Sequence, residues 1–414
     1  MVRQRQKRAQ AQSNGKVSKC FQCVRGLGGP GKNLSESRGK GMAPVVSESS
    51  NGGEDVWDGA AAENREAESG SGKKFPEHLV IMTNGIIGSA DNWRYAANQF
   101  VKKLPDKVVV HCSERNASLR TFDGVDQMGV RLAEEVKTVI ESKPGVKKIS
   151  FVAHSLGGLV ARYAIGILYE PPSGHKPEVQ NSDDSIDGDL NHNVEEESNG
   201  KIAGLEPMNF ITFATPHLGS RGHRQLPILC GIRSLENAAS HSAHWFVGRT
   251  GRHLFLNDND DDGKPPLLRR MLTDCGDLYF MSALCAFKRR VAYANVQYDH
   301  MVGWCTSSIR RQCELPELRK LPINEKYPHI LNVEIGDCNN AVPRAPAPKG
   351  DYTTDPIEEE MIASLTQVPW ERVDVCFHKS RLKFLAHSTI QVKWNWMHSE
   401  GADVICHLID NFLL

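Results

Sequence analysis

The sequence contains no run of about eighteen consecutive apolar residues, the length that a membrane-spanning helix needs. No hydrophobic segment of a secretory signal follows Met1 either. An excess of one charge is also missing, because 50 lysines and arginines balance 50 aspartates and glutamates. These absences argue against a membrane-spanning or secreted protein and against a surface devoted to nucleic acid. They predict a soluble cytoplasmic protein.

The eleven cysteines are odd in number and irregularly spaced, unlike the framework of a disulfide-stapled protein. Cys20 and Cys23 have the spacing of two zinc ligands, but no second pair lies nearby. The acidic stretch from Asn257 to Gly263 imitates a calcium-binding loop, yet Arg269 stands where such a loop needs a glutamate. We therefore predict reduced thiols, no metal site and no cofactor.

Residues 1–74 contain few apolar side chains and many glycine, serine and charged residues. Such a composition buries too little surface to offset the entropy lost on folding, so we predict a disordered arm. Eight lysines and arginines, from Arg3 to Lys32, precede the first acid, Glu36. An acid-poor basic start is typical of an organelle transit peptide, which makes a plastid the alternative location. The cations alone indicate only a non-specific affinity for nucleic acid.

From residue 75 onward, apolar stretches of strand length alternate with segments of helical periodicity. We predict strands at residues 78–83, 107–113, 149–152, 208–214, 290–298 and 372–377. Helices are predicted at residues 91–100, 132–140, 159–164, 357–365 and 401–414. This alternation predicts an α/β domain over residues 75–414, with a mostly parallel sheet covered by helices on both faces. The functional side chains of such a sheet belong at the carboxyl ends of its strands.

Two segments interrupt the alternation. Residues 170–200 contain nine acidic residues and one lysine, which predicts a surface insertion between core elements. Residues 221–288 include the apolar patches 226–232 and 245–247. These patches could cover a binding pocket as a cap or pack against the core, and the sequence leaves both possibilities open.

A serine at the bend between a strand and a helix is the main functional signal. Residues 149–152 form a largely apolar run, Ser155 follows in Ala-His-Ser-Leu-Gly-Gly, and a helical pattern begins at once. A sharp turn of this kind raises the hydroxyl above the sheet and needs small residues two positions away on either side, here Ala153 and Gly157. Ser155 is therefore the predicted nucleophile. Its neighbour His154 is expected to point away from the active face.

A serine hydroxyl needs an imidazole to accept its proton and a carboxylate to orient that imidazole. Asp299 directly follows the predicted strand 290–298, which makes it the predicted acid. For the base, His398 lies just before the last helix and His387 lies eleven residues earlier. Spacing alone leaves both histidines open. His407 belongs to the apolar stripe of the last helix and is expected to be packed.

The oxyanion that forms during ester cleavage needs two N–H donors. The N–H of Leu156, at the start of the helix after the serine, is one predicted donor. The second is expected in the loop after the first strand, most simply at Ile86.

Five segments occur in an order that resembles the putative serine esterase family of lipase-like proteins of plants and fungi: NGIIGSADNW, FVAHSLGGLVARYAIG, FITFATPHLGSRGHR, RVAYANVQYDHMVGW and AHSTIQVK. The resemblance covers residues 77–414 and is greatest to the plant members. It implies an α/β-hydrolase that acts on carboxylic esters, with acyl lipids as the expected substrates. In the family pattern the histidine follows an alanine before a short apolar run, which favours His387 over His398. Asn84 differs from the histidine that lipases commonly have before the glycine of this loop.

We expect a serine esterase or lipase in which Ser155 attacks the ester, His387 transfers the proton and Asp299 holds the imidazole. Its partners are an acyl ester or lipid and, through peripheral contact, a membrane or lipid droplet. Two alternatives stay open. One is transfer of the acyl group to an alcohol in place of water, and the other is a catalytically silent scaffold that binds partners through its arm and insertion.

Overall fold

The computed structural model describes residues 56–58, 75–172, 200–220, 248–259, 263–318, 324–336 and 355–414. The predicted arm, apart from residues 56–58, lies outside the described residues. The same holds for most of the acidic insertion and for residues 221–247 of the predicted cap. Among the helices of the described part, none combines the length and the apolar character needed to cross a membrane.

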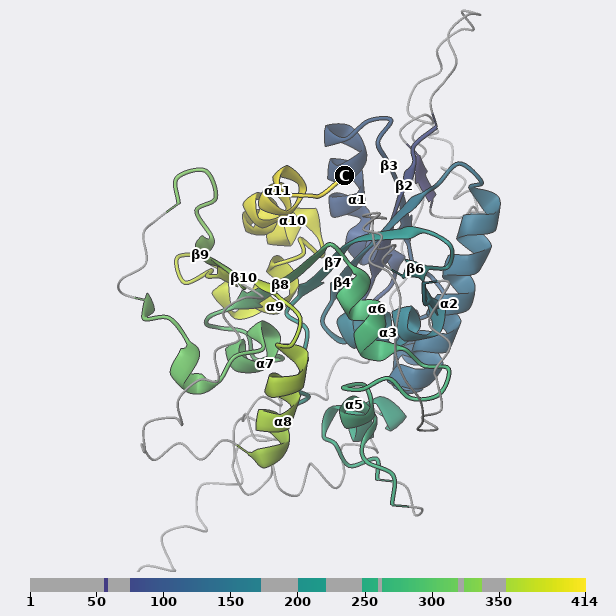
Figure 1. The fold of residues 1–414 in the computed structure, drawn as a ribbon. Helices are drawn as coiled ribbons and strands as arrows, with labels where there is room; N and C mark the ends of the chain where they lie inside the picture. Colours follow the sequence, from purple (N-terminus) through teal and green to yellow (C-terminus); the bar gives the residue numbers. More distant parts are fainter. Residues whose placement is uncertain are drawn as a thin grey trace, which may run out of the picture. The chain divides into compact units, whose positions relative to one another are not determined.

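Within the described residues, the centre of the fold is an eight-stranded sheet in the order β1-β3-β2-β4-β7-β8-β10-β9 (Figure 1). Its strands are β1 (Val56–Asp58), β2 (His78–Thr83), β3 (Val108–Cys112), β4 (Lys148–His154), β7 (Glu206–Phe213), β8 (Arg289–Asn295), β9 (Ile330–Ile335) and β10 (Glu371–Val375). The six inner strands pair with one another in parallel, whereas β1 and β9 pair antiparallel at the two edges. The predicted, mostly parallel sheet is confirmed.

The two edge strands are the part of the sheet that differs from the prediction. β1 lies inside the predicted disordered arm, and β9 lies inside a polar stretch for which no strand is predicted. β1 pairs with β3 and β9 pairs with β10. An edge strand gains its hydrogen bonds from a single neighbour and does not need the continuous apolar sequence of an inner parallel strand. The second half of β9 is accordingly exposed.

Helices cover both faces of the sheet (Figure 1). The α-helices are α1 (Arg94–Lys103), α2 (Val125–Ser142), α3 (Leu156–Leu168), α5 (Leu267–Arg270), α6 (Phe280–Ala286), α7 (Trp304–Ser308), α8 (Pro356–Leu365), α9 (Ala386–Thr389), α10 (Asn395–His398) and α11 (Ala402–Asp410). The 3-10 turns are η2 (Ala90–Trp93), η3 (Ser118–Phe122), η5 (Gln312–Glu314), η8 (Lys383–Leu385) and η9 (Ser399–Gly401). Residues 248–254 are also helical.

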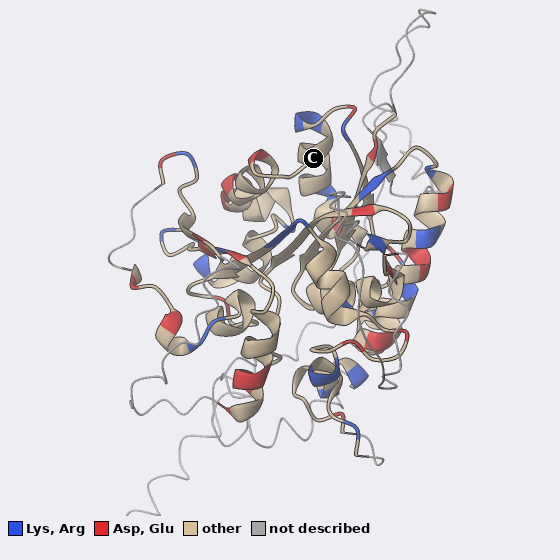
Figure 2. Cartoon of the chain, in the orientation of Figure 1, with Lys and Arg blue, Asp and Glu red and all other residues tan. Residues whose placement is uncertain are grey.

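The alternation of side chains along a strand divides the core into two layers. In β2, Leu79 and Ile81 belong to an apolar cluster that also includes side chains of α2, α3 and α6. Val80 and Met82 belong to a second cluster, which includes side chains of α1 and α11. Charged residues of both signs are mixed along the outer turns of α2 (Figure 2). The sheet is thus buried on both faces, as its apolar sequence predicts.

A small second sheet closes the base of the predicted acidic insertion. β5 (Tyr169–Glu170) pairs antiparallel with β6 (Lys201–Ile202). The chain therefore leaves the fold after α3 and rejoins it before β7 at adjacent points, which is the arrangement expected of an insertion between core elements. Residues 173–199 themselves lie outside the described residues.

The described part of the predicted cap packs against the core. Leu267 and Leu268 of α5 and Phe280 of α6 are buried in the cluster that contains α3. The Phe280 ring lies 5.4 Å from the ring of Tyr163 on α3. None of the described residues between 248 and 288 lines the cavity at Ser155. Of the two possibilities that the sequence leaves open, a cap over the pocket or packing against the core, the described residues of this segment show packing against the core.

A buried ion pair holds the β9 edge of the sheet. Nη1 of Arg310 donates to Oδ1 of Asp374 at 2.7 Å, and the two side chains are 1% and 0% exposed. Asp374 also accepts from Nε1 of Trp304 at 2.7 Å and from Nδ2 of Asn332 at 3.0 Å. One carboxylate of β10 therefore joins β9, α7 and the segment after α7.

Replacing Asp374 with asparagine is expected to lower the free energy of unfolding by roughly 3 kcal/mol, because Arg310 then stays buried with only the half-exposed Glu334 as its counter-ion. Urea unfolding followed by circular dichroism measures the change. Asp91→Asn is the matched control, since it removes the partner of Arg94 in a pair whose side chains are 64% and 61% exposed. The control should change the same free energy by no more than about 0.5 kcal/mol. Equal losses in the two variants would contradict the assignment.

Candidate active site

Ser155 lies at the turn between β4 and α3. Its backbone has φ 55° and ψ −129°, a conformation that residues with a side chain rarely adopt. Gly157 permits this turn, because a Cβ at its position would lie 2.5 Å from the carbonyl oxygen of Thr83. Ala153, in the place of the usual first glycine, is fully buried at the end of β4. The predicted strand, turn and helix around the serine are confirmed.

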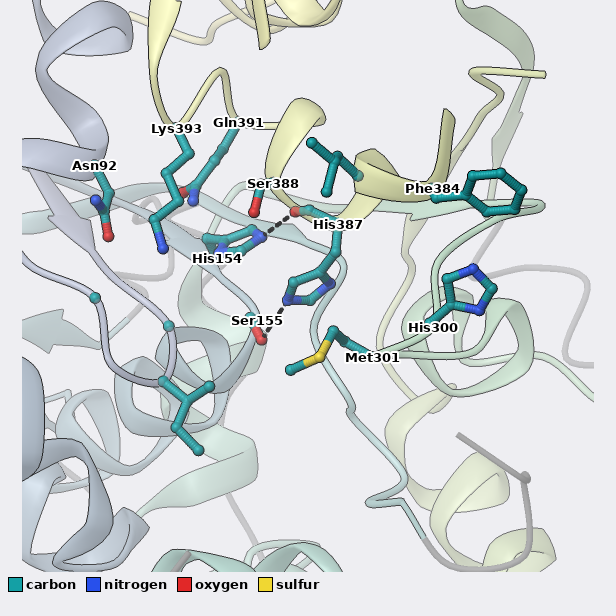
Figure 3. Close-up of a pocket in the computed structure, with 14 residues that line it drawn as sticks. Asn92, His154, Ser155, His300, Met301, Phe384, His387, Ser388, Gln391 and Lys393 are labelled. Atoms are coloured by element: carbon teal, nitrogen blue, oxygen red, sulfur yellow. Dashed lines mark hydrogen bonds between the residues drawn. The ribbon is translucent and has the colours of Figure 1, made fainter. Parts of the chain in front are cut away.

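His387 connects Ser155 to Asp299. Its Nε2 lies 3.0 Å from Oγ of Ser155 (Figure 3). Its Nδ1 lies 3.0 Å from Oδ2 of Asp299. Ser155 follows β4, Asp299 follows β8 and His387 lies on α9. In the sequence the serine lies 232 positions before the histidine, and the aspartate lies 88 positions before it. The fold brings together the three residues that the sequence analysis selected.

The Asp299 carboxylate is held by hydrogen bonds on both oxygens. Oδ1 accepts from the main-chain N–H groups of Met301 and Val302, each at 2.9 Å, and Oδ2 accepts from Nδ2 of Asn295 at 2.8 Å. Burial alone would raise the pKa of Asp299, but the charge of His387 and these hydrogen bonds outweigh it and lower the pKa below its usual value. Asp299 therefore stays charged at neutral pH and accepts a hydrogen bond from the Nδ1–H group of the imidazole. This leaves Nε2 to accept from the serine hydroxyl.

The other two histidines of the C-terminal segment are engaged elsewhere. Nδ1 of His398 accepts from the main-chain N–H of Trp394 at 3.1 Å, and burial lowers the pKa of this ring. His407 is buried and its Nδ1 lies 2.9 Å from the hydroxyl of Tyr293. No hydrogen bond within the described residues joins either ring to Ser155. The structure thus places His387 at the serine and keeps the runner-up His398 away from it.

The two predicted oxyanion donors have unused N–H groups. Neither the main-chain N–H of Leu156 nor that of Ile86 donates to an acceptor in the part of the chain that the structure describes. The N–H of Ile87 is instead bonded to Oγ1 of Thr121 at 2.9 Å. Ile86 lines the cavity at Ser155, and Leu156 is the first residue of α3. Both groups therefore remain available to a ligand.

Asn84 anchors the loop that carries Ile86. Its Nδ2 donates to the carbonyl oxygens of Gly85 and Asn116, each at 3.1 Å. Gly85 packs directly against the serine, because a Cβ at this glycine would lie 2.8 Å from Cβ of Ser155. The asparagine in the place of the usual histidine therefore holds the loop against Ser155 through its amide.

His154 is placed differently from the prediction. Its ring lines the cavity, and its Nε2 lies 2.6 Å from the main-chain oxygen of His387 (Figure 3). The centroids of the two rings are 4.6 Å apart. Burial and then the charge of His387 hold the pKa of His154 well below its usual value, so the ring is neutral and donates from Nε2. The expectation that His154 points away is wrong, because α9 lies over the end of β4 and brings a carbonyl acceptor within reach.

A cavity of about 340 Å³ opens above the serine. It is lined by Gly85, Ile86, Gly88, Asn92, His154, Ser155, His300, Met301, Phe384, Leu385, His387, Ser388, Gln391 and Lys393. The sequence analysis does not select Asn92, Gln391 or Lys393. A signal for the last two exists, since both belong to the segment AHSTIQVK that contains His387. In the described ranges, no three or more His, Cys, Asp and Glu side chains are grouped so as to hold a metal ion.

The model of the family described as putative serine esterase (DUF676) matches residues 73–313, which is more than half of the chain. The chain belongs to this family. The match includes Ser155 and Asp299 and ends before His387. Membership in the serine esterase family agrees with the α/β-hydrolase fold and with ester hydrolysis as the class of reaction.

Curated relatives of this serine esterase occur in yeasts. Putative lipase ROG1 of Saccharomyces cerevisiae is 28% identical over 267 residues, which cover 62% of this chain and 32% of that protein. Putative lipase C4A8.10 of Schizosaccharomyces pombe is 27% identical over 242 residues, which cover 56% of this chain and 26% of that protein. The serine esterase chain thus spans about a third or less of the length of these relatives.

Solved structures with a similar fold include lipase BlEst2 of Bacillus licheniformis in mature form. It is 15% identical with a TM-score of 0.29, and the match covers 58% of this chain and 71% of that chain. Phospholipase PlaB of Legionella pneumophila in complex with thio-NAD is 13% identical with a TM-score of 0.32, covering 54% and 38%. These likenesses concern the fold alone.

Proposed function

We propose that this serine esterase hydrolyses carboxylic esters through an acyl-enzyme formed on Ser155, with His387 as the general base and acid and Asp299 as the group that orients it. One observation carries the proposal: the two 3.0 Å contacts from Oγ of the serine through the imidazole to the buried carboxylate. A structural serine has no need of an imidazole that is itself fixed by a charged carboxylate. A nucleophile has that need, because its hydroxyl must lose a proton at neutral pH.

The reaction follows from this geometry in two halves. Nε2 of His387 accepts the hydroxyl proton while Oγ of Ser155 bonds to the ester carbon, and the N–H groups of Leu156 and Ile86 stabilise the oxyanion. The imidazolium then gives its proton to the departing alcohol, which leaves an acyl group on the serine. In the second half, His387 accepts a proton from water as the water attacks the acyl-enzyme. The carboxylic acid departs and the serine regains its proton.

The cavity supports an ester with an apolar acyl chain as the substrate. Met301, Phe384 and Leu385 line it beside the catalytic residues, and these side chains are 37%, 61% and 38% exposed. Apolar side chains that are partly open to solvent at the mouth of a cavity give an acyl chain a surface to pack against. Acyl lipids are therefore the substrates that we propose. Contact with a membrane or lipid droplet stays a prediction.

A fluorophosphonate probe tests the proposal against the alternative of a silent scaffold. The probe should form a covalent adduct on Ser155 alone, because only a serine with an activated hydroxyl attacks the phosphorus atom. Mass spectrometry of tryptic peptides locates the adduct, and heat-denatured protein is the control for non-specific labelling. A native protein that stays unlabelled at Ser155, or that carries the label on another serine, would contradict the mechanism.

A further inference from the structure

The cavity above Ser155 has two ends of different chemistry (Figure 3). Met301 and Phe384 lie on one side of the catalytic pair, and Asn92, Gln391 and Lys393 lie on the other. The first side is apolar apart from His300, whereas the second offers an ammonium and two amides. The substrate carbonyl must meet the hydroxyl between the two ends. The acyl part and the alcohol part of an ester therefore extend into different surroundings.

Lys393 brings a charge into the cavity without an acid to neutralise it. Apart from the histidines, it is the single lining residue whose side chain can carry a charge. Its Nζ lies 5.2 Å from the centroid of the Trp394 ring, and no acid pairs with it among the described residues. Burial lowers the pKa of Lys393. A cation that is partly removed from water is stabilised when an anion binds next to it.

Two amide side chains, those of Gln391 and Asn92, line the same end of the cavity as Lys393. The side chain of Gln391 is 1% exposed, and its buried amide oxygen has no hydrogen-bond partner among the described residues. An unpaired buried amide oxygen is costly, and no hydrogen bond within the described residues occupies the NH₂ group of this amide, which is left as a donor. Oδ1 of Asn92 already accepts from the main-chain N–H of Ser89 at 3.1 Å, which leaves the Asn92 NH₂ group as a donor. Three donors thus lie at one end of the cavity.

We propose that Lys393, Gln391 and Asn92 form a subsite for an anionic group, a phosphate or a carboxylate, on the alcohol part of the ester. The acyl chain then lies at the end formed by Met301 and Phe384. The inference rests on the proposed ester hydrolysis and adds the class of substrate to it: an apolar acyl ester of an anionic alcohol. A neutral ester of the same size leaves the ammonium and the buried amide without partners.

Matched pairs of esters test the subsite. Octanoylglycerol phosphate and octanoylglycerol share the acyl chain and differ in the phosphate. The octanoyl esters of para-hydroxybenzoate and para-hydroxybenzamide differ in a single negative charge on a small, soluble alcohol. For each pair the measured quantity is the ratio of kcat/KM for the anionic ester to kcat/KM for the neutral ester, below the concentration at which the esters aggregate. Preference in the first pair alone assigns the subsite to a lipid phosphate, and preference in both assigns it to anions generally.

Lys393→Gln is expected to lower this ratio by roughly 10- to 100-fold, the range of a hydrogen bond to a charged group. Lys393→Arg keeps the charge and should keep most of the preference. Lys379→Gln removes an exposed lysine that does not line the cavity, and it should leave the ratio unchanged. The ratio also separates substrate recognition from a general effect of Lys393 on the oxyanion, which would lower kcat/KM for both esters equally. An absent preference in the natural protein, or an equal loss for both esters, would overturn the inference.

Calorimetric binding of octyl phosphate to Ser155→Ala gives a readout that does not depend on turnover. Lys393→Gln in this background should weaken the affinity by the same 10- to 100-fold. If none of the esters is hydrolysed but octyl phosphate binding depends on Lys393, the proposed function fails and the subsite stands. If the esters are hydrolysed and the affinity for octyl phosphate does not depend on Lys393, the subsite fails and the proposed function stands.

Discussion

Replacing Ser155 with alanine is expected to lower kcat/KM for para-nitrophenyl octanoate by about 10⁴- to 10⁶-fold. The variant keeps the cavity, the imidazole and both oxyanion donors but loses the atom that forms the acyl-enzyme. Hydrolysis of the nitrophenyl ester at 25 °C, with enzyme concentrations high enough to detect the residual rate, measures the loss. Fluorophosphonate labelling should disappear in the same variant.

The Ser155→Ala substitution should leave the fold unchanged. Ser155 is 5% exposed, and its hydroxyl bonds only to His387 among the described residues, so the melting temperature should stay nearly constant. Ser142→Ala is a suitable control, because Ser142 ends α2 and its hydroxyl bonds to the carbonyl oxygen of Val139. The control should retain full activity. A Ser155→Ala protein that is folded and active would end the proposal.

His387→Ala should have an effect of the same size on kcat/KM, about 10⁴- to 10⁶-fold. Without the imidazole the serine loses the group that accepts its proton, and the buried Asp299 carboxylate contacts the serine hydroxyl only through His387. The neighbouring His154 does not substitute, since its ring is held by the Nε2 bond to the main-chain oxygen of His387 and makes no hydrogen bond to Ser155 among the described residues. The same nitrophenyl assay measures the loss.

His398→Ala is the matched control for this prediction. It removes the other histidine that the sequence offered as the base, and the structure bonds that ring to Trp394. Because His398 is 1% exposed, its loss should lower the free energy of unfolding by about 1–3 kcal/mol while activity at 20 °C is retained. Urea unfolding and the ester assay together distinguish the two variants. A large loss of activity in His398→Ala with little loss in His387→Ala would reverse the assignment.

The elbow at Ser155 could be predicted because its signal is local. A strand, a strained turn and a helix occupy consecutive residues, and the small residues Ala153 and Gly157 are needed by the turn itself. Asp299 could be predicted for a related reason, since it directly follows a strand that is apolar enough to be recognised. The parallel sheet then places both at the same edge, because its strands run in one direction.

The histidine at Ser155 was harder to predict, because the short helix that carries it, α9, has no regular pattern in the sequence. Spacing left His387 and His398 as equals, and only the resemblance to the serine esterase family favoured His387. The structure separates them through contacts that are distant in sequence: His387 meets Asp299, 88 positions away, whereas His398 turns back to Trp394 within its own segment. No sequence periodicity encodes such a choice.

Local rules also failed where a neighbour in space decides the outcome. β9 is held by its pairing with β10, and the orientation of His154 is set by a carbonyl of α9. The described part of the residues predicted as a cap packs on α3, because Phe280 and its neighbours meet an apolar helix face there. Apolar side chains read from sequence show that a surface is buried but not against which surface.

The sequence by itself determined the α/β alternation, the elbow at Ser155 and the carboxylate at Asp299, because each depends on side chains within a few positions of one another. The tertiary structure alone decided which histidine reaches the serine. It also decided that Lys393 enters the same cavity, where no acid among the described residues pairs with it. Both depend on how segments far apart in the chain meet at one edge of the sheet, and that meeting is set by the packing of the whole domain.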